Sequence, residues 1–253
     1  MAATVGGLHA GALAAVAAIV LAAGFIQATA GFGFALLAVP LLALVLPPQT
    51  AVVVTFLHGT CSSLLTAGRH HRQVDRTETA RLGLGAVLGL PLGALILTTA
   101  SASVLRLLVG LATCAAALWM LRPRRQPPAP RTVAPLATVG VGMVSGVLNT
   151  AVATNGPPLV VYLRSRGLHG EPFRATLSAV FVISNVVGLV VLAVVGAVHG
   201  AAVAVFALTL VPATVGWFAG NHAAGRLRTA HFVRMVDLVL LASGLLAIGR
   251  ALV

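Results

Sequence analysis

Two short glycine-containing segments interrupt long apolar stretches of the chain. The first break reads AGFG at 30–33, and the second reads TNGPP at 154–158. Each precedes a short apolar segment, so each predicts free backbone N–H groups at the start of a short helix. A helix start carries partial positive charge and binds anions. The breaks therefore predict an anion site, and the alternative is that they are kinks between packed helices.

Polar residues and glycines in and near the breaks are the candidate ligands. Glycine lets a backbone approach a ligand closely. A buried amide or hydroxyl in lipid costs several kcal/mol unless it has a partner or a wet cavity. Hydrogen bonding between helices is the competing use of such side chains. The predicted substrate-binding set is Gln27, Thr29, Gly31, Gly33, His58, Ser62, Asn149, Thr154, Asn155, Gly156 and Asn185.

His58 and Asn185 are predicted to lie at one depth in the membrane. Each is eleven residues from an arginine of a basic segment, Arg69 and Arg174. At 1.5 Å per residue both lie about 16 Å deep, near the middle of a hydrocarbon core about 30 Å thick. An ionisable residue at that depth indicates function. A buried histidine bonded to a backbone carbonyl is the alternative.

The acidic residues point away from cation transport. Asp75, Glu78 and Glu171 fall in predicted basic loops, and Asp237 follows Arg234 closely enough to pair with it. No acid is thus expected near the midplane, where a cation carrier would need one.

Enzyme and cofactor signatures are missing from the sequence. It contains no HExxH, GxSxG or P-loop motif. The two cysteines, Cys61 and Cys114, lack metal-ligand spacing and are expected to be buried apolar side chains. We expect no enzyme activity, no catalytic residue, no metal and no cofactor.

Composition defines the elements that must position these residues. Hydrophobic residues make up 59% of the 253 residues and charged residues 8%, against about 25% charged in soluble domains. The chain is therefore an integral membrane protein whose partner is the lipid bilayer. The net charge of +12 comes from arginines between apolar runs rather than along one helix face. This distribution indicates topology and disfavours nucleic-acid binding.

Eight apolar segments are long enough to cross a bilayer, and two are shorter. The basic loops are predicted to be cytoplasmic and both termini external. The long segments are 10–28, 50–67, 82–99, 104–121, 133–150, 175–195, 201–220 and 232–248, the short ones are 34–46 and 157–163, and the loops are 69–81, 122–131, 164–174 and 222–231.

The order of breaks and spans predicts an internal duplication. Each half has a broken or re-entrant helix hairpin followed by three transmembrane helices, and the loop charges require the halves to be inverted. The predicted fold is an all-α membrane protein of two inverted repeats with about 8–10 membrane helices. The repeats are 1–122 and 133–253, joined by a cytoplasmic Pro/Arg linker at 123–132. Such transporters bind their substrate at the midplane between the repeats.

Three motifs resemble those of the sulfite exporter TauE/SafE family, also called the 4-toluene sulfonate uptake permease family. They are GFGFALLAVP at 31–40, NGPPLVVYL at 155–163 and FRAT at 173–176. The resemblance covers nearly the whole chain. Family members often have Gly-Gly-Pro-Pro where this chain has Asn155-Gly156-Pro157-Pro158, which places an amide at the expected site.

The resemblance implies export of sulfite, sulfonates or related sulfur-containing anions across the bacterial inner membrane. The alternatives are a transporter of another small organic anion, a membrane assembly factor or an intramembrane enzyme. The expected partner is a small anionic substrate. A homo-oligomer is compatible with the sequence.

Overall fold

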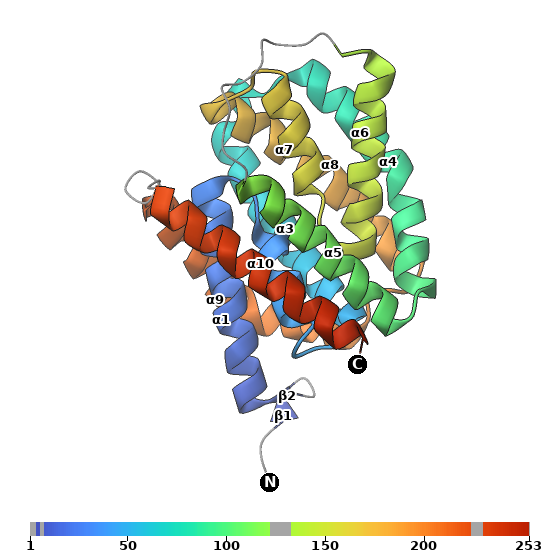
Figure 1. The fold of residues 1–253 in the computed structure, drawn as a ribbon, viewed down its shortest axis with the longest axis vertical. Coiled ribbons are helices and arrows are strands. Elements are labelled where there is room, and N and C mark those ends of the chain that lie inside the picture. Colours follow the sequence, from blue (N-terminus) through green and yellow to red (C-terminus); the bar gives the residue numbers. More distant parts are fainter. Residues whose placement is uncertain (1–3, 6–7, 122–132, 224–229, 253) are drawn as a thin grey trace.

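The computed structural model describes residues 4–5, 8–121, 133–223 and 230–252. The predicted linker at 123–132 lies outside the described residues. Ten α-helices occupy the described part of the chain (Figure 1). They are α1 (Ala10–Ala30), α2 (Phe34–Leu42), α3 (Pro48–His70), α4 (Arg76–Thr99), α5 (Ala102–Leu121), α6 (Pro135–Val152), α7 (Gly156–Ser165), α8 (Gly170–Val194), α9 (Gly200–Ala223) and α10 (Ala230–Leu252).

Seven of these helices are long and apolar enough to cross a membrane, and α10 contributes a shorter apolar segment, Leu238–Ala251. This confirms the multi-pass α-helical prediction. The structure adds a 3₁₀ turn, η1 (His71–Gln73), and two short antiparallel strands before α1, β1 (Thr4–Val5) and β2 (Leu8–His9). The start of α1 and the end of α10 both lie in the lower part of Figure 1.

The predicted loop 69–81 is wrong at its second end, because α4 begins at Arg76. Asp75 is the N-cap, and its carboxylate accepts a hydrogen bond from the backbone N–H of Glu78 at 3.0 Å. The spacing Asp-x-x-Glu at a helix start is a capping signal. Glu78 is therefore helical rather than in a loop.

Helix α4 shows how small residues set the helix packing. Gly85 and Gly89 face α6, and a Cβ on either would collide with the backbone of Val139 or Met143. The opposite face exposes Leu84 and Leu88. An apolar surface of this kind fits lipid, and glycines allow close packing of membrane helices.

Four helix pairs dominate the packing: α4 with α6, α1 with α9, α5 with α10, and α3 with α8. Figure 1 shows α5 and α10 side by side across the molecule. They are compatible with a twofold relation between the halves, which would exchange α1 with α6 and α4 with α9 and so relate the α4–α6 pair to the α1–α9 pair. The inversion of the two repeats stays a prediction.

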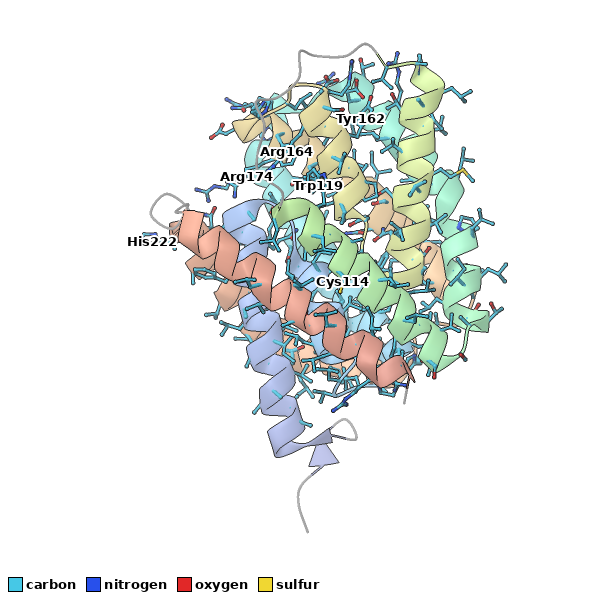
Figure 2. The ribbon with its side chains drawn as sticks, viewed as in Figure 1. Cys114, Trp119, Tyr162, Arg164, Arg174 and His222 are labelled. Atoms are coloured by element: carbon cyan, nitrogen blue, oxygen red, sulfur yellow. The ribbon has the colours of Figure 1, made fainter. Side chains whose placement is uncertain are left out.

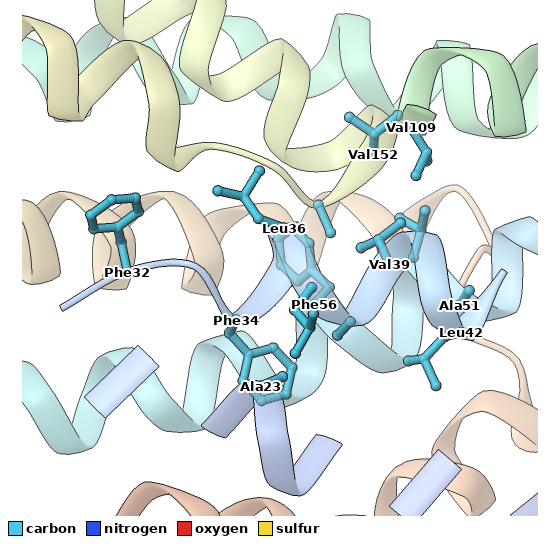
Figure 3. Close-up of a cluster of buried hydrophobic side chains, with 14 of the residues drawn as sticks. Ala23, Phe32, Phe34, Leu36, Val39, Leu42, Ala51, Phe56, Val109 and Val152 are labelled. Atoms are coloured by element: carbon cyan, nitrogen blue, oxygen red, sulfur yellow. The ribbon is translucent and has the colours of Figure 1, made fainter. Parts of the chain in front are cut away.

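The short helix α2 lies inside the bundle. Its buried residues include Phe34, Leu36, Val39 and Leu42, and Figure 3 shows them among side chains of other helices. Protein side chains rather than lipid therefore cover these residues of α2. The surrounding helices thus hold the start of α2 in place.

Candidate anion site

The first break places free amides at the start of α2. Gly31 and Gly33 have φ angles of 87° and 107°, a left-handed region that suits glycine. The Gln27 Oε1 atom accepts a hydrogen bond from Phe34 N at 3.0 Å. The next two amides, Ala35 and Leu36, have no intrahelical acceptor because they belong to the first turn.

The second break turns at a residue other than the predicted one. Helix α6 ends at Val152, and Ala153 adopts the left-handed conformation with φ of 53°. The non-helical residues are therefore 153–155 rather than 154–156, and α7 begins at Gly156. Pro157 and Pro158 occupy its first turn, as predicted from their fixed φ and missing N–H.

The two breaks meet at one cavity. The volume that the centre of a water-sized sphere can occupy inside it is about 30 Å³. A region of this size for the centre of the sphere has room for a few waters or one small anion. Its walls come from α1 to α3 and from α6 to α8. They comprise Gln27, Gly33, Phe34, Ala35, Leu36, Thr55, Phe56, Gly59, Ser63, Asn149, Ala153, Thr154, Asn155, Gly156, Phe181 and Asn185.

Seven of the eleven predicted site residues line this cavity. They are Gln27, Gly33, Asn149, Thr154, Asn155, Gly156 and Asn185. Their role in binding stays a prediction, but helices distant in sequence bring them together. Each half of the chain contributes both a helix start and polar side chains.

A chain of side-chain hydrogen bonds connects α6 to α3 through α8. Asn149 Nδ2 donates to Asn185 Oδ1 at 3.0 Å, and Asn185 Nδ2 donates to Ser63 Oγ at 3.4 Å. Asn155 Nδ2 lies 3.4 Å from Ser184 Oγ. Because Ser63 accepts in this chain, its hydroxyl hydrogen remains available to a ligand.

The other four predicted residues lie outside the cavity wall. The Thr29 hydroxyl donates to the carbonyls of Phe25 and Ile26, which is ordinary helix back-bonding. Gly31 packs under the Arg174 side chain. Ser62 is buried on α3, and its carbonyl accepts from Thr66.

His58 faces α9 instead of the cavity. Its Nε2 atom lies 2.9 Å from Thr209 Oγ1, and its ring packs between Phe34 and Phe206. The side chain is 1% exposed. The structure therefore gives His58 a packing role between α3 and α9, while Asn185 alone of the predicted midplane pair lines the cavity.

Sequence analysis did not identify Thr55 and Ser63. Together with Gly59 they repeat every four residues, which places them along one face of α3. His58 and Ser62 follow the neighbouring face. The i, i+4, i+8 spacing of small and polar residues was the available signal for the correct face.

Arg174 holds the end of α1 beside the first break. Its Nη2 atom donates to the carbonyl oxygens of Ala28 at 2.7 Å and Thr29 at 2.9 Å. Figure 2 shows Arg174 in the upper half of the molecule, with Arg164 and Tyr162 of α7. A cation at a helix C-terminus offsets the negative end of the helix dipole, so Arg174 limits the negative potential that α1 brings to the site.

Glu78 is a buried acid, contrary to its predicted loop position. It is 3% exposed and accepts hydrogen bonds from Tyr162 Oη at 2.8 Å and Arg166 Nε at 3.1 Å. The Thr138 hydroxyl lies 2.7 Å from that of Tyr162. This cluster ties the far end of α7 to α4 and is separate from the cavity, whose described lining contains no charged side chain.

The lining offers hydrogen bonds but no reactive group. Its polar side chains are amides and hydroxyls, and its backbone donors are helix-start amides. Across the described residues, no group of three or more His, Cys, Asp or Glu residues could hold a metal ion. The arrangement is therefore suited to holding a small anion.

Comparison with known proteins gives a match to the sequence model of a family. No curated protein and no solved structure matches it. The sequence model of the sulfite exporter TauE/SafE family matches residues 16–247, which include both breaks and all ten helices in whole or in part. The chain is a multi-pass membrane protein and belongs to the TauE/SafE sulfite exporter family, a family of membrane transporters.

Proposed function

We propose that this protein exports sulfite or a related small sulfur-containing anion across the bacterial inner membrane. The observation that carries the proposal is the single cavity at which both half-helix starts meet. Helix starts point partial positive charge and free N–H groups at a ligand. Broken helices at the repeat interface form the substrate site in several transporter folds.

The dimensions of the cavity support a compact substrate. Space for a few waters suits sulfite or methanesulfonate. An aromatic sulfonate would require the walls around Phe56 and Phe181 to move apart. We therefore rank sulfite and small aliphatic sulfonates above toluenesulfonate.

The membrane potential favours the proposed direction. The cell interior is negative, so each exported negative charge gains about 2.3 kcal/mol per 100 mV. Efflux of an anion can then proceed without a coupling ion. No acid lines the described cavity to relay protons.

The test is efflux from proteoliposomes containing purified protein and loaded with sulfite, sulfoacetate or toluenesulfonate. Ser63→Ala removes a cavity hydroxyl, while Ser62→Ala removes a buried hydroxyl one residue away that lies outside the wall. We expect sulfite efflux by the wild type and by Ser62→Ala, and slower efflux by Ser63→Ala. Sulfite retention by folded wild-type protein would contradict the proposal, and preference for a non-sulfur anion would favour the alternative substrate class.

Orientation can be tested separately. Gln73 lies on the exposed turn η1 in a predicted cytoplasmic loop. In a variant lacking Cys61 and Cys114, Gln73→Cys should resist a membrane-impermeant thiol reagent in intact cells and react after permeabilisation. Labelling in intact cells would reverse the proposed topology.

A further inference from the structure

An unpartnered hydroxyl at the cavity indicates a ligand contact that no motif marks. Thr55 lies on α3, is 1% exposed and lines the cavity. Its Oγ1 atom is buried and has no hydrogen-bond partner among the described residues. A buried polar atom without a partner is rare and costly in folded proteins. Thr55 is explained if the substrate supplies the missing partner.

The potential at the cavity is positive, but the positive charge that produces it is small. Each half-helix start carries at most about half a positive charge, so α2 and α7 together supply at most about one. The start of α7 supplies less, because Pro157 and Pro158 in its first turn have no N–H. The side chains of the described lining are neutral. Titratable His58 lies behind Phe34, with ring centroids 5.8 Å apart, and Arg174 is bonded to the end of α1. Neither of them lines the cavity.

The negative ends of α1 and α6 are covered at the breaks. Arg174 donates to the last turn of α1. At the end of α6, the amides of Ala153 and Thr154 donate to the Leu148 carbonyl, and the Thr154 hydroxyl donates to Val152 O. These bonds pair carbonyls at the ends of α1 and α6, whereas the Ala35 and Leu36 amides in the first turn of α2 have no intrahelical acceptor.

We propose that this site selects anions with a single negative charge and excludes dianions of the same shape, with Thr55 as a direct ligand contact. The inference rests on the proposed function and specifies its substrate class. Attraction to a fixed positive potential grows in proportion to the ligand charge. The cost of leaving water grows with its square, so it is about fourfold larger for a dianion. A site with at most about one positive charge and neutral donors offsets the dehydration cost of a monoanion far better than that of a dianion.

The substrate class is accordingly the hydrogen sulfite or sulfonate form rather than sulfate or fully ionised sulfite. A monoanion can accept hydrogen bonds from the Ala35 and Leu36 amides and from the hydroxyls of Thr55 and Ser63. Because each exported substrate carries one negative charge, the membrane potential changes the free energy of efflux by the amount for one charge.

The experiment measures binding to purified protein by isothermal calorimetry, using methanesulfonate and sulfate, which share a tetrahedral shape and differ in charge. We expect methanesulfonate to bind at least about tenfold more tightly. Sulfite should bind more weakly as rising pH converts it to the dianion, while methanesulfonate affinity stays constant and controls for titration of the protein, His58 included.

Thr55→Val keeps the shape of the side chain and removes the hydroxyl. It should weaken methanesulfonate binding about tenfold to a hundredfold, the effect of losing one hydrogen bond to a charged group. The matched control is Thr60→Val, because the Thr60 hydroxyl donates to Phe56 O within the same helix. Unfolding temperature checks that both variants fold.

The outcomes separate this inference from the proposed function. Sulfate affinity equal to or above that of methanesulfonate would overturn charge selection while leaving anion transport intact. Full affinity in folded Thr55→Val would overturn the ligand contact. If none of sulfite, methanesulfonate and sulfate binds, both the proposed function and the inference are overturned.

Discussion

Reversing the polarity of one cavity atom should abolish anion binding without unfolding the protein. Gln27 is 4% exposed, lines the cavity and uses Oε1 to cap Phe34 N at 3.0 Å. Gln27→Glu is nearly isosteric, so one carboxylate oxygen can keep the cap. The other replaces the Nε2 donor with a negatively charged acceptor.

The size of the effect follows from two losses. A hydrogen bond to a charged group contributes about 1.5–3 kcal/mol. Two like charges about 4 Å apart repel by about 4 kcal/mol at an effective dielectric of 20. Since 1.4 kcal/mol is a factor of ten in affinity, binding should weaken by more than about a thousandfold. Lowering the pH should restore part of the binding affinity, because protonation of the introduced carboxylate removes its charge.

The assay is methanesulfonate binding together with sulfite efflux from proteoliposomes. Gln49→Glu is the control, because it makes the same charge change in the first turn of α3, at a residue outside the cavity lining. Gly33→Asp is a poorer probe, since φ of 107° would strain any residue with a side chain. Near wild-type affinity in folded Gln27→Glu would refute the anion site.

Three further substitutions test packing. Glu78→Ala should lower stability by about 1–3 kcal/mol, seen as a fall in unfolding temperature, because it removes the acceptor of the buried Tyr162 hydroxyl and of the partly exposed Arg166. Gly89→Val should prevent the close packing of α4 on α6 and reduce folded yield, whereas Gly140→Val meets open space and should be tolerated. His58→Ala should cost about 2–5 kcal/mol through lost packing, with substrate affinity unchanged; a specific loss of affinity would return His58 to the site.

The local features of this protein were readable from its sequence. The shortage of charged residues identified a membrane protein, because a soluble fold of this length must cover its surface. Glycine and proline placed both helix breaks within one residue, since they act on the backbone dihedrals of their own segment. Asp75 and Glu78 also held the capping signal that starts α4 early.

Tertiary structure decided which side chains meet. Helix α3 has polar residues on two neighbouring faces, and each residue turns the side chain by about 100°, so its sequence left open which face meets the cavity. Packing against α8 and α9 therefore chose the face of α3 that presents Thr55 and Ser63 to the cavity and His58 to Thr209. Contacts such as Asn149 with Asn185 or Arg174 with Ala28 join distant parts of the chain. They arise from the way in which the helices pack together, and no local pattern in the sequence encodes them.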